Sequence, residues 1–314
     1  MIEVKDLTRV YGNHTAVDSI SFTVEDGKIY GFLGPNGAGK STTMNMITGC
    51  LSITSGQILI NGYDIFEKPE KAKKCIGYLP EIPPLYTDMT PYEYLMFTAG
   101  AKGVKRSERK RAVCDALEAT GLTHMKDRLI KNLSKGYKQR VGIAQAIVSN
   151  PEIIILDEPT VGLDPIQIIE IRDLIKSLAK DHTVIISSHI LSEIKAVCDD
   201  VIIINKGKII ACDSIDNLES TLKGNLEINL EAKASFEQIK ELLSDFQVTF
   251  KEEENGYVKA VVYAEGDEKA VMEKIFNAFA SASKPIISMS RVKADLENIF
   301  VEMTEKEEKN DSDL

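Results

Sequence analysis

The sequence predicts an α/β fold in two parts, a larger one built on a mainly parallel sheet and a smaller α+β one. Two observations predict the larger part: short, almost continuous runs of Ile, Val and Leu, and helical stretches that alternate with them through about residue 215. Parallel strands that helices cover on both faces have this apolar composition. A change of pattern near Gly224 predicts the smaller part.

The elements of the larger part follow in chain order. Segments 2–10 and 20–24, with turn sequences at Gly12-Asn13 and Asp26-Gly27, predict antiparallel strands. Five apolar runs predict the strands of the main sheet: 28–33, 76–79, 153–156, 183–187 and 201–205. Three intervening segments predict helices: 40–48, 139–148 and 165–178. Pro165 follows Asp164, an order that is typical of a first helical turn.

The smaller part has the predicted order strand, helix, strand, strand, helix, strand. These elements are expected at 226–230, 236–246, 247–251, 258–263, 268–280 and 285–290. This order is the split arrangement of ferredoxin-like domains. An amphipathic segment, 296–303, precedes a highly charged tail whose composition is typical of disorder. We therefore expect one domain at 1–221, with a helical subdomain at about 82–150, a second at 222–303, and a disordered tail at 304–314.

Composition excludes several classes of protein. The chain has 314 residues, of which 43% are hydrophobic, so it can bury a large core. Its 38 Lys and Arg against 48 Asp and Glu give a net charge of −10, which argues against a general nucleic-acid binder. No apolar run approaches the ~20 residues of a membrane-spanning helix, and the start has no signal-peptide layout. Five cysteines without metal-type spacing indicate reduced thiols and a cytoplasmic location.

A glycine-rich segment between a predicted strand and a predicted helix carries the clearest chemistry. It reads, in order, Gly34, Pro35, Asn36, Gly37, Ala38, Gly39, Lys40, Ser41 and Thr42. Glycines let backbone N–H groups converge on phosphate oxygens, and the following helix N-terminus adds a favourable dipole. Lys40 supplies a cation to the β- and γ-phosphates, and the Ser41 hydroxyl can bind Mg²⁺. The segment therefore predicts a phosphate-binding loop.

A second strand ends in two carboxylates. The apolar run 153–156 is followed by Asp157 and Glu158. Successive side chains of a strand point to opposite faces, so the two carboxylates should have different roles. Asp157 is expected to bind Mg²⁺ or its water, and Glu158 is expected to act as general base toward the attacking water.

With these motifs in place, the first 215 residues or so resemble the ATP-binding cassette (ABC) family. Segment 133–140 is similar to the family signature, normally Leu-Ser-Gly-Gly-Gln; Ser134 and Gly136 match it, whereas Lys135 and Tyr137 depart from it. Ser134 is expected to cap the following helix, whose N-terminus can face an anion. The resemblance implies that this helix end meets the γ-phosphate of the ATP held by the other protomer.

The resemblance also implies roles for other residues. Gly162, Leu163 and Asp164 correspond to the family's dimer-contact loop. His189 resembles the switch histidine, which senses the γ-phosphate and holds the attacking water near Glu158. Tyr11 occupies the position of the aromatic residue that stacks on adenine, with Val17 packing close by. Aromatic stacking of this kind contributes ~1–3 kcal/mol per base.

One position departs from the family in its chemistry. The family usually carries Gln after the strand that leads to the helical subdomain, whereas this chain has Glu81. Glu81 can still accept contacts from Mg²⁺ or water, and we count it among the expected catalytic and metal-binding residues. This form resembles a branch of ABC exporters whose membrane half is a separate polypeptide.

The resemblance implies an ATPase, with ATP and Mg²⁺ as cofactors, that works as a homodimer or as a heterodimer with a similar ATPase. A separate integral membrane permease would be driven by dimer closure, with the chain peripheral on the cytoplasmic face of the membrane and no nucleic acid as partner. Segment 82–86 is the expected contact with that permease. Two other readings stay open: a non-transport ABC ATPase acting on nucleic acid or the ribosome, and a nucleotide switch regulated by a ligand of the C-terminal domain.

Overall fold

The computed structural model describes residues 1–218, 226–254, 256–264 and 266–291. The amphipathic segment expected at 296–303 and the tail expected at 304–314 lie outside these ranges. The chain divides into two compact units, Met1–Ile215 and Asp216–Leu314. In the described part of the chain, no helix has the length and apolar composition that crossing a membrane requires.

An antiparallel sheet opens the first unit. Its strands are β1 (Ile2–Tyr11), β2 (His14–Val24), β4 (Ser55–Ile60) and β5 (Tyr63–Asp64), in the order β2-β1-β4-β5. The second strand begins at His14 rather than at residue 20, because β1 and β2 stay paired as far as Tyr11 and His14. The same register places Val17 opposite Arg9, near the end of the hairpin.

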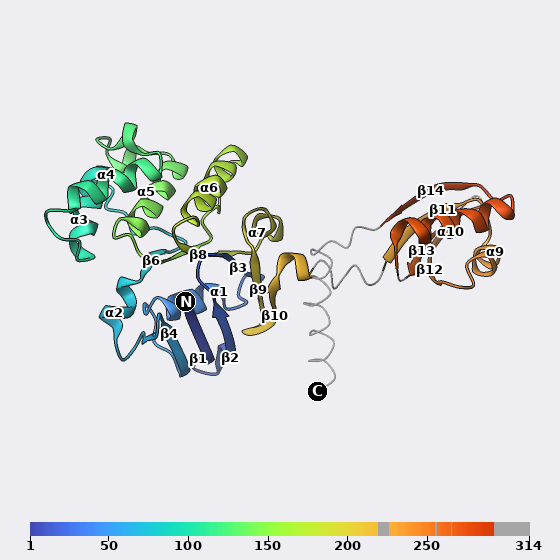
Figure 1. The fold of residues 1–314 in the computed structure, drawn as a ribbon, viewed down its shortest axis with the longest axis horizontal. Helices are drawn as coiled ribbons and strands as arrows, with labels where there is room; N and C mark the ends of the chain where they lie inside the picture. Colours follow the sequence, from blue (N-terminus) through green and yellow to red (C-terminus); the bar gives the residue numbers. More distant parts are fainter. Residues whose placement is uncertain (219–225, 255, 265, 292–314) are drawn as a thin grey trace. The chain divides into compact units, whose positions relative to one another are not determined.

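The second sheet is mainly parallel and forms the centre of the first unit. Its strands are β3 (Ile29–Leu33), β6 (Ile76–Leu79), β7 (Ile153–Asp157), β8 (Thr183–Ser188), β9 (Asp200–Asn205) and β10 (Lys208–Ser214). The order is β10-β9-β3-β8-β7-β6, and only the edge strand β10 runs antiparallel to its neighbour. Every residue of β3, β7 and β8 is buried. The carboxyl ends of these three neighbours therefore meet at one edge of the sheet (Figure 1).

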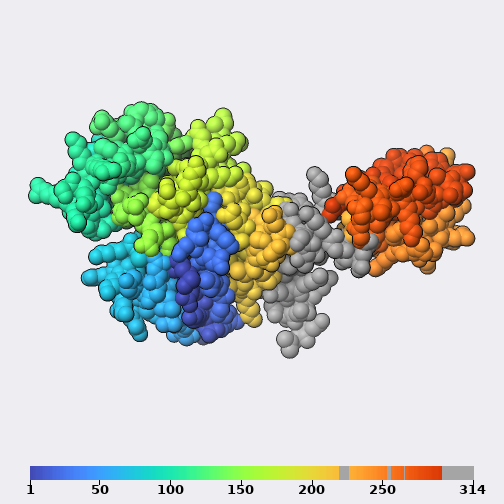
Figure 2. Space-filling view, in the orientation of Figure 1, coloured from blue at the N-terminus to red at the C-terminus, as the bar shows by residue number. Residues whose placement is uncertain are grey.

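Helices cover this sheet and build a separate lobe (Figure 1), which is the green part of the surface in Figure 2. Those near the sheet are α1 (Lys40–Ile47), α2 (Pro69–Lys74), α6 (Pro165–Leu178) and α7 (Leu191–Val197). The lobe contains α3 (Pro91–Ala101), α4 (Arg109–Ala119) and α5 (Lys135–Ile147), with two short 3-10 turns, η1 (Thr123–Met125) and η2 (Ile130–Asn132). The structure starts α5 four residues before the predicted start at 139, because the Ser134 side chain caps it by accepting the Tyr137 N–H at 3.4 Å.

The second unit has the predicted order of elements. They are β11 (Leu226–Ala232), α9 (Phe236–Leu242), β12 (Gln247–Glu254), β13 (Tyr257–Ala264), α10 (Glu268–Ser281) and β14 (Ile286–Arg291). The sheet order is β12-β13-β11-β14, and all neighbours are antiparallel. This is the ferredoxin-like arrangement. Its apolar core includes Ile228, Ile275 and Phe279, each fully buried.

Candidate functional site

The glycine-rich segment forms the loop between β3 and α1. Gly37 and Gly39 have φ values of +83° and +107°, which residues other than glycine rarely adopt. A Cβ at Gly34 would lie 2.3 Å from the Ile204 carbonyl oxygen, so the loop also needs glycine for its close approach to β9. Gly39 precedes α1 directly, which leaves the first N–H groups of that helix without side-chain caps. The loop can therefore present backbone donors to an anion.

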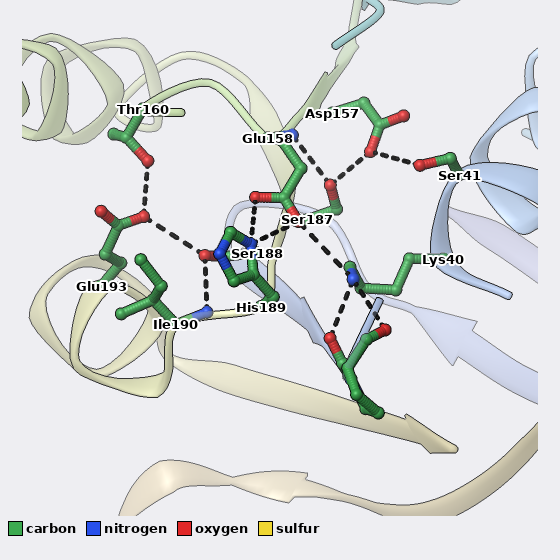
Figure 3. Close-up of polar contacts among 12 residues, drawn as sticks. Lys40, Ser41, Asp157, Glu158, Thr160, Ser187, Ser188, His189, Ile190 and Glu193 are labelled. Atoms are coloured by element: carbon green, nitrogen blue, oxygen red, sulfur yellow. Dashed lines mark hydrogen bonds and ion pairs between the residues drawn. The ribbon is translucent and has the colours of Figure 1, made fainter. Parts of the chain in front are cut away.

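Lys40 begins α1 and is almost completely buried. Its ammonium group donates to the carbonyl oxygens of Gly34 at 2.8 Å and Pro35 at 3.2 Å. The same Nζ lies 3.5 Å from Glu158 Oε1 (Figure 3). The cation is thus held between the phosphate-binding loop and the carboxylate that follows β7.

Asp157 ends β7 and is buried next to the start of α1. The Ser41 hydroxyl donates to Asp157 Oδ1 at 3.3 Å, and the Ser187 hydroxyl donates to the same oxygen at 2.5 Å (Figure 3). Ser187 also accepts the Glu158 N–H at 2.9 Å. Sequence reasoning missed Ser187, although its place at the end of a neighbouring parallel strand could have indicated it.

Glu158 and His189 form a direct pair. Nδ1 of His189 lies 3.1 Å from Oε1 and 3.0 Å from Oε2 of Glu158. The Glu158 side chain is 7% exposed, whereas that of His189 is 37% exposed. Glu158 has a φ of +48°, a left-handed conformation that is costly for a residue other than glycine. Such strain is common at sites where a side chain must be held in one position.

Tyr11 lies at the end of the antiparallel hairpin and is 44% exposed, so one part of its ring is accessible to a ligand. The Arg9 guanidinium carbon lies 4.6 Å from the centre of that ring, within the range of a cation–π contact. Val17, by contrast, is fully buried. Arg9 was absent from the sequence-based site, because a single arginine beside a tyrosine has no motif.

The signature segment and the predicted dimer-contact loop lie together. A hollow of about 260 Å³ is lined by Ser134, Gly136, Tyr137 and Asp164, together with Arg140 and four residues of α6. Lys135 packs over Gly162, since a Cβ there would be 2.2 Å from its Nζ. No residue of the phosphate-binding loop lines this hollow. The signature residues and the phosphate-binding loop therefore do not share this hollow.

Glu81 is exposed, in the loop after β6. Among the described residues, no hydrogen bond or ion pair joins it to Ser41 or Asp157. Its role as a metal ligand stays a prediction.

A buried polar cluster next to the Glu158–His189 pair was also missed. Glu193 on α7 is 8% exposed and accepts hydrogen bonds from the hydroxyls of Thr160 and Ser188 (Figure 3). The sequence offers one signal: Thr160 and Ser188 flank the two predicted catalytic residues.

A groove of about 620 Å³ lies between the sheet and the helical lobe. Its lining includes Tyr78 and Pro84, the aromatic residues Tyr86, Tyr94 and Phe97, and two lysines, Lys73 and Lys102. No Asp or Glu lines it. Burial lowers the pKa of Lys102 to about 8, and its Nζ donates to the Ala146 carbonyl oxygen at 3.1 Å.

The loop, the buried lysine and the two acidic residues at the end of another parallel strand of the same sheet define a P-loop nucleotide hydrolase. The ABC transporter family profile matches residues 17–161. The chain is also 37% identical over 305 residues to the bacitracin transport ATP-binding protein BcrA of Bacillus licheniformis, an alignment that covers 96% of this chain and 97% of the relative. The chain therefore belongs to the ABC transporter family, as one of its ATP-hydrolysing subunits.

Two further proteins are similar. The linearmycin resistance ATP-binding protein LnrL of Bacillus subtilis is 36% identical, with 97% of this chain and 98% of the relative covered. A solved dimeric structure of a bacterial ABC transporter cassette matches with a TM-score of 0.62 at 25% identity, covering 68% of this chain and 99% of that chain. These findings confirm the predicted family, fold class and ATPase activity. None of them supports the alternative hypothesis that the chain is a non-transport ATPase.

Proposed function

We propose that this chain powers an exporter, as a dimer that closes around two ATP molecules and drives a separate membrane permease. The observation that carries the proposal is the Glu158–His189 pair, 3.0 Å apart, beside Lys40 and the phosphate-binding loop. The relatives that support export are named for bacitracin transport and linearmycin resistance. Bacitracin and linearmycin are accordingly the first export substrates to test.

Each residue of the loop region has a proposed role in binding. The backbone N–H groups of 34–42 and the ammonium of Lys40 hold the β- and γ-phosphates. Tyr11 stacks on adenine, and Val17 supports the strand beside it. Within the described part of the chain, no three His, Cys, Asp or Glu side chains form a metal site. Ser41 and Asp157 nevertheless supply the oxygen donors that Mg²⁺ prefers, with phosphate oxygens completing the set. Bound there, the ion would neutralise charge that develops on the phosphates.

The hydrolytic step uses Glu158 and His189. Glu158 accepts a proton from water as the water oxygen forms a bond to the terminal phosphorus, and the bond from that phosphorus to the bridging oxygen of ADP breaks. His189 Nδ1 orients the Glu158 carboxylate, and its other ring nitrogen is available to the water or the γ-phosphate. Glu81 is proposed to contact the metal or the water once nucleotide is bound.

Dimerisation follows from the separation of the two surfaces. The hollow that contains Ser134 and Gly136 includes none of the phosphate-binding loop, so a second protomer has to bring Ser134, Lys135, Gly136 and Tyr137 to the γ-phosphate. Gly162, Leu163 and Asp164 would contact the partner at the same time. Exposed Ile166 and Ile169 on α6, at 71% and 58%, are suited to burial in that interface. The similar dimeric cassette supports this assembly.

The groove between the sheet and the helical lobe is the proposed contact with the permease. Tyr86 lines it, and Ile82 nearby is 82% exposed, which agrees with a contact at 82–86. This contact would hold the chain on the cytoplasmic face of the membrane. Residues 222–303 are proposed to form an accessory domain, separate from the nucleotide-binding domain at 1–221.

The test replaces Glu158 by Gln. This variant should bind ATP and accumulate as an ATP-loaded dimer, while steady-state hydrolysis falls by at least ~100-fold, because the amide cannot take the water proton. Light scattering and phosphate release report the two effects. The matched control is Glu152→Gln, which changes an exposed carboxylate at the opposite end of β7 and should leave turnover unchanged. Normal turnover in Glu158→Gln, or an ATP-loaded form that stays monomeric, would contradict the proposed function.

A further inference from the structure

A buried carboxylate lies beside the catalytic pair without touching it. Glu193 belongs to α7, and its Oε2 accepts the Thr160 hydroxyl at 2.5 Å and the Ser188 hydroxyl at 3.2 Å. Figure 3 shows this carboxylate between the segment after Glu158 and the segment that contains His189. Burying a carboxylate is costly unless hydrogen bonds offset the cost, so an apolar side chain would serve a purely packing role better.

The hydrogen bonds of Glu193 continue to both sides of His189. Ser188 precedes His189, and its Oγ also accepts the Ile190 N–H at 3.0 Å. A continuous chain of hydrogen bonds thus runs from Thr160 through Glu193 and Ser188 to the backbone of Ile190. Thr160 itself follows Glu158 by two residues. Both members of the Glu158–His189 pair are therefore attached to one carboxylate through their chain neighbours.

Glu193 also contacts one residue before and one residue after the proposed dimer-contact loop. Thr160 precedes residues 162–164, and α6 follows them. Arg172 of α6 places Nη2 4.0 Å from Glu193 Oε1. A displacement of the loop by a partner protomer would reach the carboxylate from either side, and through Ser188 it would reach His189.

We propose that Glu193 is a positioning residue: it fixes His189 relative to Glu158 and ties that placement to the dimer-contact loop. This inference rests on the proposed roles of Glu158, His189 and the loop. His189 Nδ1 lies 3.0 Å from Glu158, so a shift of about 1 Å would break the contact. Misplacement on this scale reduces rates by about a hundredfold. Among the described residues, no hydrogen bond or ion pair joins Lys40 directly to Thr160, Glu193 or Ser188, so nucleotide affinity should be spared.

The experiment measures kcat and KM for ATP hydrolysis by the full chain. Glu193→Ala should lower kcat by about ten- to a hundredfold and change KM by less than about threefold. Glu193→Gln should restore most of the rate, because its amide oxygen accepts both hydroxyls. Thr160→Val should lower kcat and Thr160→Ser should not, since only serine keeps the donor. The matched control is Thr120→Val, which removes a fully buried hydroxyl that donates to the Ala116 carbonyl oxygen at 2.7 Å, in the helical lobe.

A double-mutant cycle separates positioning from a structural role. If Glu193 acts through His189, Glu193→Ala should have no further effect on the single-turnover rate in a His189→Ala background. ADP affinity, measured on each variant, should stay within threefold of the original. Should Glu193→Ala fail to fold, the Thr160→Val and Thr160→Ser pair decides, because both keep the carboxylate and nearly the same volume.

Three results would overturn the inference: kcat of Glu193→Ala within twofold of the original, Thr160→Val as active as Thr120→Val, or fully additive effects of Glu193→Ala and His189→Ala. In each case a severe loss in Glu158→Gln would leave the proposed function standing. Normal turnover in Glu158→Gln would instead reject the proposed function itself.

Discussion

Arg9 determines which face of the Tyr11 ring is accessible to a nucleotide. Its guanidinium lies 4.6 Å from the ring centre, and its Nη1 donates to the Ser52 hydroxyl at 3.1 Å, so it is anchored from the other side. The cation covers one face of the ring, so the proposed stacking on adenine would use the other face. The tyrosine is held in place before any base arrives, which reduces the entropy cost of stacking.

Replacing Arg9 by Met should weaken ADP binding by about two- to fivefold, which corresponds to ~0.5–1 kcal/mol for an exposed cation–π contact. Tyr11→Ala should weaken it more, by ~1–3 kcal/mol, because the stacking surface itself is lost. Isothermal titration of the full chain with ADP measures both. Arg106→Met, an exposed arginine in the helical lobe, is the control. A larger loss in Arg9→Met than in Tyr11→Ala would contradict this ordering.

Which site residues the sequence could predict depends on how local their signal is. The phosphate-binding loop, Asp157 and Glu158 are each contiguous with an apolar strand, so a motif and one strand locate them. Ser187 and Glu193 act through partners 30 and 33 residues away along the chain, and Arg9 is anchored beside Tyr11 by Ser52, 43 residues away. Such pairs form only when the sheets have assembled, and no sequence motif predicts them. Glu81 is a different case: its position after β6 suggests a ligand, its side chain is exposed in the described structure, and its role stays a prediction.

Among the elements, α3 ends at a lysine with an unusual environment. Lys102 follows α3 and reaches the Ala146 carbonyl oxygen on α5, in a groove without acidic side chains. Burial disfavours the charged form, so its pKa falls from 10.5 to about 8. In the unfolded chain the lysine stays protonated up to its ordinary value. The unfolded state therefore binds more protons between pH 8 and 10.5, and this lysine makes the folded state relatively more stable as the pH rises through that window.

Lys102→Met should accordingly be more stable than the original chain at pH 7, by about 1–3 kcal/mol: burial of the charge costs about 3 kcal/mol, offset by about 1 kcal/mol for the lost hydrogen bond. The advantage should shrink between pH 8 and 10. Urea unfolding at pH 7, 8, 9 and 10 measures the difference. Lys105→Met, which changes a side chain that is 80% exposed, should show no such trend. A constant difference between the two chains at all four values would show that the charge of Lys102 costs nothing.

The elements differ in how well the sequence specifies them. The buried strands β3, β7 and β8 are predicted within one or two residues, because nothing but an apolar strand fits runs of that length between glycine and polar residues. The sequence predicts the start of α5 four residues late, since Lys135, Gly136 and Tyr137 have no helical pattern and only the Ser134 cap extends the helix over them. The sequence does not predict the first six residues of β2, from His14 to Ser19, because the strand is polar and exposed at its start.

For the molecule as a whole, two apolar cores matter most. The cluster around Phe32, Met44 and Ile202 belongs to the first unit, and the cluster around Ile228 and Phe279 belongs to the second. They have no residue in common. No sheet is shared between the units and each has its own core, which is the physical requirement for unfolding as a separate cooperative unit.

Scanning calorimetry should therefore resolve two unfolding transitions. Ile228→Ala should lower the temperature of one transition, and Ile202→Ala should lower that of the other. Each substitution should reduce the free energy of unfolding of its unit by the ~2–5 kcal/mol that a fully buried Ile→Ala change costs. ADP with Mg²⁺ should raise only the transition that Ile202→Ala lowers, because ligand stabilises the unit that binds it. A single transition shifted equally by both substitutions would show that the units unfold together.

The ion pair between Lys40 and Glu158 has a consequence for any study that uses Glu158→Gln to capture the closed assembly. In the original chain, an incoming triphosphate exchanges one anion for another at the lysine, and its observed affinity is the difference between the two. A glutamine removes the competing anion. Tighter retention of nucleotide by Glu158→Gln would thus have two causes: hydrolysis is blocked, and Lys40 has lost its competing carboxylate. His189→Ala keeps the Lys40–Glu158 ion pair, so it measures the effect of blocked hydrolysis alone.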